Sequence, residues 1–280
     1  PNDDGTPVAV VCSTELATLC QTLDDETNGL EVRVEPAWVT FDRLSDGERG
    51  GVDVWLAAGR WGEMVNGRLE RNQQEALFET LDPLASAPLA LVAYKDDVAK
   101  LPCASAATWA CIGEAAATGA LRLGAPDPDR DATGISLVAA ATGGHVGTPE
   151  FAANDLDVAH EARVTELGRR LAEHRGTSLE TMLATPALLD AFAALGPVLA
   201  PVVVTAAARD QVSVLVPTPV ATVTVAPAVA NDRGRDVIEL LRGIAERHLG
   251  EYGWDVEPPP APENDGLPSP GVLEALRELI

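Results

Sequence analysis

Short polar loops lie beside apolar runs at several points of the chain, and their residues are of types that hold small ligands. The residues concerned are Ser13, Thr14, Ala58, Gly59, Trp61, Asp131, Thr133, Gly134, Thr205 and Ala206. Hydroxyls and the backbone N–H groups of helix starts suit an oxyanion or a carboxylate, and a tryptophan suits an apolar or sugar ring. The structural alternative is simpler, because a Ser or Thr that opens a helix usually caps it and a tryptophan usually packs.

Four cysteines, Cys12, Cys20, Cys103 and Cys111, form two pairs that are each close in sequence. Neither a Cys-x-x-Cys motif nor a neighbouring histidine accompanies them, which argues against a zinc site. An even number of cysteines in local pairs is typical of disulfides formed in an oxidising compartment. Four cysteines allow three pairings, and the short loops favour Cys12–Cys20 with Cys103–Cys111. Buried free thiols are the alternative.

The sequence contains no motif of the common catalytic sites. A Gly-x-Ser-x-Gly elbow, a phosphate-binding Walker loop and a His-Glu-x-x-His helix are all absent. The four histidines, His145, His160, His174 and His248, are scattered, so we expect surface or structural roles for them. Residues 143–147 are rich in glycine but lack a lysine and a preceding strand, which indicates a loop. We therefore expect no enzyme, no metal and no cofactor.

The charge of the chain excludes several classes of partner. Its 280 residues carry 20 basic and 43 acidic side chains, a formal net charge of −23. Nucleic acids and anionic lipids attract clustered Lys and Arg, so neither is expected as a partner. Hydrophobic residues make up 46%, enough for one large or two modest cores. The first residues lack a signal-peptide pattern and no run of about 18 apolar residues occurs, so a targeting or anchoring segment would lie outside this sequence.

Short apolar segments typical of strands alternate with segments of helical periodicity, and this pattern predicts an α/β fold. Strands are expected at residues 8–11, 30–34, 51–57, 89–94, 121–125, 201–205, 212–216 and 220–225. Helices are expected near Ser13 and at residues 109–116, 135–140, 158–174, 178–195, 235–249 and 273–280. Loops or turns are expected at residues 58–61, 85–88 and 126–134, and a proline-rich connector at residues 258–262. Strands that alternate with helices pair in parallel, and ligands bind at the carboxyl ends of such strands.

The order of these segments follows that of a known family. Residues 11–15 end the first strand in a Ser-containing loop, and residues 52–57 form a strand that opens with Asp-Val. Residues 84–92, with Ser86, stand where that family's chain crosses from one lobe to the other. A strand, proline loop and helix start follow at 122–134, a strand and loop at 201–207, and a closing strand, helix and glycine–aromatic turn at 220–254. In this order the chain resembles the type 2 solute-binding proteins of ABC importers, particularly the molybdate- and sulfate-binding branch and its uncharacterised relatives.

The resemblance implies a two-lobed α/β fold of the type 2 periplasmic-binding-protein kind. Each lobe would be a mixed, mostly parallel sheet flanked by helices, and two hinge crossings would join the lobes. Lobe 1 would comprise residues 1–86 and 215–280, and lobe 2 residues 87–214. On this map each favoured disulfide lies within one lobe and leaves the hinge free. Ser86, near the hinge, joins the ligand-binding candidates.

Two positions depart from the family pattern. Residues 225–227 read Val-Ala-Pro where relatives often have a Tyr-Pro pair, and Thr205 stands where the molybdate branch often presents a tyrosine. Oxyanion specificity is therefore not carried over to this chain.

The function that the resemblance implies is capture of a small molecule or oxyanion in an interlobe cleft. The protein would be extracellular or periplasmic, anchored to a membrane through a segment outside this sequence, monomeric, and partnered with an ABC permease. An alternative on the same fold is a ligand-sensing or degenerate interaction ectodomain of a larger cell-surface protein. An enzyme such as a small-acid lyase or dehydratase is less well supported, because no catalytic constellation is present.

Overall fold

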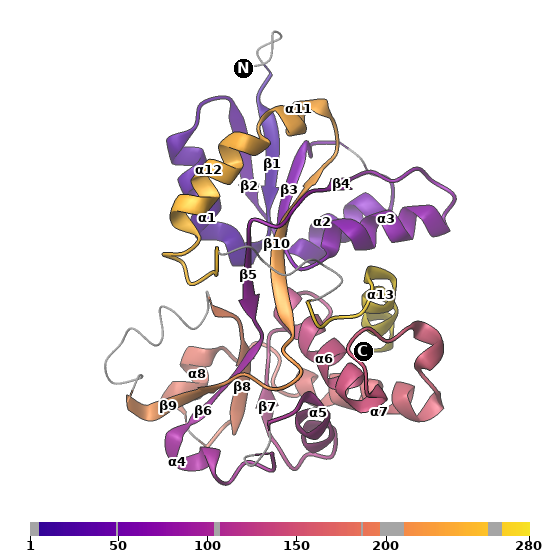
Figure 1. The fold of residues 1–280 in the computed structure, drawn as a ribbon, viewed down its shortest axis with the longest axis vertical. Coiled ribbons are helices and arrows are strands. Elements are labelled where there is room, and N and C mark those ends of the chain that lie inside the picture. The colour runs from indigo at the N-terminus through magenta and orange to yellow at the C-terminus, as the bar shows by residue number, and fades with distance from the viewer. Residues whose placement is uncertain (1–5, 49, 104–106, 186, 197–209, 257–264) are drawn as a thin grey trace. The chain divides into compact units, whose positions relative to one another are not determined.

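The computed structural model of the chain (Figure 1) describes residues 6–48, 50–103, 107–185, 187–196, 210–256 and 265–280. The chain divides into two compact units. Unit 1 comprises Pro1–Ser86 and Thr224–Pro259, and unit 2 comprises Ala87–Val223 and Pro260–Ile280. The chain therefore passes from one unit to the other at residues 86/87, 223/224 and 259/260.

Unit 1 is built on a mixed sheet with the strand order β2-β1-β3-β10-β4, to which β5 adds by pairing with β10. The strands are β1 (Val8–Cys12), β2 (Leu30–Val34), β3 (Val54–Ala58), β4 (Glu79–Thr80), β5 (Ala85–Pro88) and β10 (Thr222–Val229). Strand β1 pairs in parallel with β2 and β3, whereas β10 runs antiparallel to β3 and β4. All residues of β3 are buried, as expected for an apolar strand covered on both faces.

Helices cover both faces of this sheet. They are the 3-10 helix η1 (Thr14–Leu16), α1 (Ala17–Glu26), α2 (Ala37–Ser45), α3 (Trp61–Arg71), α11 (Asp232–Asp236) and α12 (Ile238–His248). Helix α1 packs against α12 and α2 packs against α3, on opposite sides of the strands in Figure 1. The amphipathic helices thus bury their apolar stripes on the sheet and expose their charged faces.

Unit 2 contains a second mixed sheet with the strand order β7-β8-β6-β9. The strands are β6 (Ala90–Tyr94), β7 (Leu123–Gly124), β8 (Ala191–Ala194) and β9 (Val212–Leu215). Strand β6 runs antiparallel to β8 and β9, and β7 runs parallel to β8. The predicted α/β class with two mixed sheets is confirmed, although parallel pairs among the described strands are limited to β2-β1-β3 and β7-β8.

Helix α6 (Ala132–Val146) is the centre of the helical part of unit 2. It packs against α5 (Trp109–Ala117), α7 (Val158–Ala172) and α13 (Pro270–Leu279). The remaining helices of this unit are α4 (Lys95–Val98), η2 (Ala153–Asp155) and α8 (Leu179–Ala184). Residues 132–143 of α6 are all buried, as expected of a helix that is apolar all round and enclosed by others.

Several segments differ from their prediction. Residues 178–195, expected as one helix, form the short helix α8 and then strand β8. The residue before a proline avoids the helical region, and Thr185, which precedes Pro186, has φ −135° and ψ 76°. Residues 85–88, expected as a turn, form strand β5, while α2 and most of α3 were not anticipated.

The helix expected at residues 235–249 is likewise interrupted. It forms α11 and α12, which meet at Val237. A Cβ on Gly234 would lie 2.2 Å from the carbonyl oxygen of Asp53, the residue before β3, so the close approach of α11 to the start of β3 requires glycine there. The strand predicted at 201–205 and the connector at 258–262 lie outside the described residues.

The unit boundaries differ from the predicted lobes at the C-terminal side. The first passage falls at residues 86/87, the position expected from the sequence, but the second lies at 223/224 rather than 214/215. Strand β9 belongs to unit 2 because it pairs with β6, and the Leu89 N–H donates to the Ala221 carbonyl at 2.8 Å. Residues 260–280, expected in lobe 1, belong to unit 2, where α13 packs against α6 and α7.

Throughout the described ranges, each helix is too short or too polar to cross a bilayer.

Candidate functional site

Ser13 ties together the carboxyl ends of strands β1 and β3 in unit 1. Its N–H donates to the Leu56 carbonyl at 2.8 Å, and its Oγ accepts a hydrogen bond from the Ala58 N–H at 3.3 Å. The residue is fully buried. Thr14, which begins η1, is exposed. The serine of this predicted ligand loop therefore shapes the loop, and the adjacent threonine presents the accessible hydroxyl.

Ala58 and Gly59 lie at the same edge of the sheet, where β3 ends. Ala58 is paired with Val225 of β10, and the Gly59 N–H donates to the Thr224 carbonyl at 2.8 Å. Gly59 has φ +83°, a left-handed conformation that favours glycine. The structure thus brings Ser13, Thr14, Ala58 and Gly59 to one edge of the sheet.

Trp61 is part of the core of unit 1. Its side chain is 1% exposed, and its ring meets that of Phe41 edge-on with 5.8 Å between centroids. Edge-to-face contacts of this kind are typical of packed aromatic pairs. The ring is therefore engaged with α2 instead of presenting a face to solvent.

Ser86 lies on β5 at the last position of the first segment of unit 1, and it is 6% exposed. Its backbone exchanges two hydrogen bonds with Asp255, each 2.8 Å long. The backbone of this candidate therefore serves as a strand-like contact between two distant segments of unit 1.

The unit 2 candidates Asp131, Thr133 and Gly134 lie at the start of α6. The Asp131 carboxylate caps the helix by accepting the Thr133 N–H at 2.7 Å. Thr133 is 2% exposed. Because the Asp131 carboxylate already sits at the positive end of the helix, this helix start is poorly suited to a second anion.

Gly134 allows the preceding loop to pack onto the first turn of α6. A Cβ at this position would lie 2.4 Å from the Pro126 carbonyl oxygen and 2.6 Å from the Pro128 Cα. Only glycine fits such a contact without displacing the backbone. Thr205 and Ala206, the other unit 2 candidates, lie outside the described residues.

Glu35 was missed by the sequence analysis although it lies at the same sheet edge as Ser13. Its N–H donates to the Cys12 carbonyl at 3.0 Å, and its carboxylate accepts hydrogen bonds from Thr40 at 2.5 Å and Arg43 at 3.1 Å. Burial raises the pKa of this carboxyl, but these hydrogen bonds and the nearby Arg33 outweigh it and hold the pKa below its ordinary value. The position of Glu35 directly after the predicted strand at residues 30–34 was the signal from which it could have been found.

Both predicted disulfides are present. Cys12–Cys20 and Cys103–Cys111 have Cα–Cα distances of 6.4 and 5.9 Å. Cys12 immediately precedes Ser13, so the first disulfide ties the end of β1 to α1.

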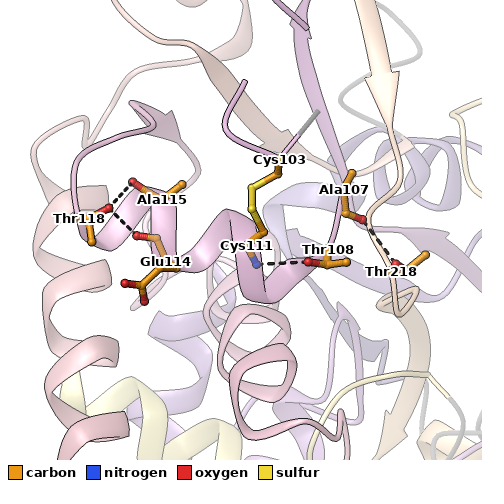
Figure 2. Close-up of a disulfide and its surroundings, with 8 residues drawn as sticks. All are labelled: Cys103, Ala107, Thr108, Cys111, Glu114, Ala115, Thr118 and Thr218. Atoms are coloured by element: carbon orange, nitrogen blue, oxygen red, sulfur yellow. Dashed lines mark hydrogen bonds between the residues drawn. A yellow bond between two sulfur atoms is a disulfide. The ribbon is translucent and has the colours of Figure 1, made fainter. Parts of the chain in front are cut away.

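The second disulfide joins the start of α5 to the chain that follows α4, as Figure 2 shows. Beside it, Thr108 caps α5 by accepting the Cys111 N–H at 3.3 Å, and the Thr218 N–H donates to the Ala107 carbonyl at 2.9 Å. Each disulfide lies within one unit, as the resemblance implied.

Two histidines line a small cavity between α5, α6 and α7, away from the strand ends. The rings of His145 and His160 meet edge-on with 5.8 Å between centroids, beside the ion pair of Glu114 and Arg163 at 3.2 Å. The cavity offers about 20 Å³, room for roughly one water molecule.

The pKa of His145 is lowered, first by burial and then by the charges of Arg163 and His160, against the opposing effect of Glu114. No group of three or more His, Cys, Asp or Glu side chains that could hold a metal ion occurs among the residues that the structure describes.

Comparisons with known proteins find similar structures but no similar sequence family. No family model matches the sequence, and no curated protein matches it. A periplasmic thiamin-binding protein, 12% identical, superposes with a TM-score of 0.61 over 98% of this chain and 93% of its own. The chain has the two-lobed fold of the periplasmic binding proteins.

Two further structures extend this likeness. The Trichodesmium protein IdiA (FutA), in complex with iron and citrate, is 14% identical, with a TM-score of 0.57 over 97% of this chain and 98% of its own. A putative spermidine/putrescine ABC transporter from Listeria monocytogenes is 10% identical, with a TM-score of 0.56 over 96% and 84%. At such identities the likeness establishes the fold and says nothing of the ligand.

Proposed function

We propose that this chain is an extracellular or periplasmic solute-binding protein that captures a small ligand and delivers it to an ABC permease. The observation that carries the proposal is the superposition of nearly the whole chain, 98%, on 93% of a periplasmic thiamin-binding protein. Polar loops at the strand ends and helix start of the two units support it, because α/β folds bind ligands at such edges. Assignment to the molybdate- and sulfate-binding branch stays a prediction.

We propose ligand contacts for each unit separately. Thr14 and the backbone around Ala58 and Gly59 would provide those of unit 1, with Ser13 fixing their position and Ser86 lying near the first passage. The first turn of α6, from Asp131 to Gly134, would provide those of unit 2 together with Thr205 and Ala206. The support is local: Thr14 is exposed, and both Ser13 and Asp131 hold neighbouring N–H groups in place.

The charge pattern favours a neutral or cationic solute over a free oxyanion. The Asp131 carboxylate occupies the start of α6, and the candidate contacts include neither Lys nor Arg. A formal net charge of −23 adds a long-range field that repels anions and attracts cations. Thiamine, named for one similar structure, and spermidine and putrescine, named for another, are cationic solutes of this kind.

The alternative, a degenerate interaction ectodomain, is favoured by one specific observation. Ser13, Trp61, Ser86 and Thr133 are at most 6% exposed, so few of the candidate side chains reach solvent. Polar side chains that are buried within the fold are not available to a ligand, so such a site would bind small molecules weakly. We further propose that the chain acts by binding and not by catalysis, that it is monomeric, and that it is anchored to a membrane.

Thermal unfolding against a compound panel tests the proposal. The panel contains thiamine, spermidine, putrescine, ferric citrate, molybdate, sulfate, amino acids and sugars. A specific ligand at about 100 times its Kd stabilises the folded chain by roughly 2.7 kcal/mol. Thr14→Val should reduce that shift, whereas Thr18→Val, at an exposed position of α1, should leave it unchanged. Failure of every compound would favour the interaction ectodomain.

A further inference from the structure

Residues 126–131, the proline loop, lead into α6. Its backbone closes on itself, because the Asp127 carbonyl accepts the N–H groups of Arg130 and Asp131, both at 2.9 Å. The Asp127 carboxylate also pairs with Arg175 at 3.1 Å. The loop ends at Asp131, the cap of α6, so its conformation sets where the candidate contacts of unit 2 begin.

The C-terminal helix contacts the proline loop through one largely enclosed arginine, Arg277. The Arg277 Nε–H of α13 donates to both the backbone carbonyl and the carboxylate Oδ1 of Asp129, each at 2.9 Å. The Arg277 side chain is 12% exposed, whereas the Asp129 side chain is 45% exposed, so the arginine is largely enclosed and reaches out to a loop residue that meets solvent. A single guanidinium therefore holds both the main chain and the side chain of the loop's central residue.

Helix α13 is itself firmly seated in unit 2. Its apolar face is buried at Val272, Leu273 and Leu276, and it packs against α6 and α7. The Thr165 Oγ donates to the Leu279 carbonyl at 3.2 Å. A Cβ on Gly168 would lie 2.7 Å from the Ile280 Cβ, so the end of the chain fits closely on α7. Figure 1 shows α13, in yellow, beside α6 and α7.

We propose that α13 is a positioning element for the proline loop and that Arg277 is the positioning residue. Its contact with Asp129 keeps the loop in the conformation that presents Asp131 and the first turn of α6 to ligand. The inference rests on the proposed function for its purpose, but the contact itself lies within unit 2 and can be tested without a ligand. Helix α13 thus contributes to the candidate site although none of its residues lies in it.

Hydrogen exchange of the full chain, followed by mass spectrometry, tests the contact. The amides of Arg130 and Asp131 report loop opening, because both donate to the Asp127 carbonyl. Arg277→Met should raise their exchange rates by about tenfold or more, equivalent to about 1.4 kcal/mol. Arg277→Lys keeps a donor and should give a smaller increase. Arg163→Met, which removes a half-exposed arginine paired with Glu114, should leave the loop unchanged.

The amides of β6 serve as the internal reference for folding of unit 2. If they stay protected in Arg277→Met while loop exchange is unchanged, the proposal is overturned. If Arg277→Met does not fold, Arg277→Lys decides: loop exchange faster than in Arg163→Met supports the proposal, and equal exchange overturns it.

A binding readout separates this proposal from the proposed function. For the panel compound that stabilises the wild-type chain most, Arg277→Met should raise Kd by about tenfold while Arg163→Met does not. Equal Kd values in the two variants would overturn the link between loop and ligand. If no compound of the panel binds the wild-type chain, the proposed function loses its support, and loop exchange alone decides the role of Arg277.

Discussion

The Oγ of Ser13 accepts the backbone N–H of Ala58 over 3.3 Å, joining the ends of β1 and β3 through a hydroxyl that is shielded from solvent. From the sequence alone, Ser13 is predicted to contact a ligand or to cap a helix. In the structure it caps no helix, because η1 begins without a side-chain hydrogen bond from Ser13. It shapes the sheet edge on which the exposed Thr14 sits.

Ser13→Ala should destabilise unit 1. The substitution leaves the Ala58 N–H buried without its acceptor, which costs about 1–3 kcal/mol. Thr14→Ala removes an exposed hydroxyl one residue later and should change stability by less than about 0.5 kcal/mol. Urea unfolding followed by tryptophan fluorescence gives both values. Equal effects of the two substitutions would contradict the structural role of Ser13.

Gly134→Ala should destabilise unit 2 strongly. The added methyl would meet the Pro126 carbonyl oxygen at 2.4 Å, so the proline loop must move, at a cost of about 3 kcal/mol, the upper end for overpacking. Gly271→Ala is the matched control on α13, where an added Cβ meets nothing within 4 Å. That change should be neutral or stabilise by up to about 1 kcal/mol. A tolerated Gly134→Ala would show that the loop does not pack as described.

His145 should titrate below its ordinary pKa of about 6.5, because burial and the neighbouring Arg163 disfavour its protonated form. The folded-state pKa is thus lower than the unfolded-state one. Its contribution to stability is therefore complete above about pH 6.5 and is lost as the pH falls through the folded-state pKa. NMR titration of labelled histidine measures this directly, and a His145 pKa at or above 6.5 would contradict the account.

Removal of either disulfide should cost about 2–3 kcal/mol, since each closes a loop with a sequence separation of 8 residues. Paired Cys→Ser substitutions at Cys12 and Cys20, or at Cys103 and Cys111, should therefore have similar effects on unfolding by denaturant. Alkylation of the unreduced wild-type protein provides the check on the starting state. Any labelled thiol would show that the bonds are incomplete.

The features predicted correctly from the sequence are those with strong local signals. The apolar, β-branched run of β1 favours a buried strand, and close cysteine spacing singled out the two disulfides. The alanine-rich run that forms β8 was read as helix, because alanine favours helices and a short apolar run suits either state. Its place beside β6 decided the outcome.

The candidate site was predictable in position but not in detail. The sequence places Ser13 and Gly59 at strand ends. It does not reveal that the side chains of Ser13 and Trp61 point inward, because their direction depends on contacts with Ala58 and Phe41. The placement of α13 in unit 2 was also out of reach. Its apolar stripe could cover either lobe, and its contacts with α6 and α7 decide between them.

The most direct test of the central claim is isothermal titration calorimetry of the full chain with the compound that gives the largest thermal shift. The account predicts one saturable site per chain with a micromolar or tighter Kd, and a preference for a neutral or cationic solute such as thiamine or spermidine over molybdate or sulfate. Absence of saturable binding for every compound in the panel would contradict a solute-binding function.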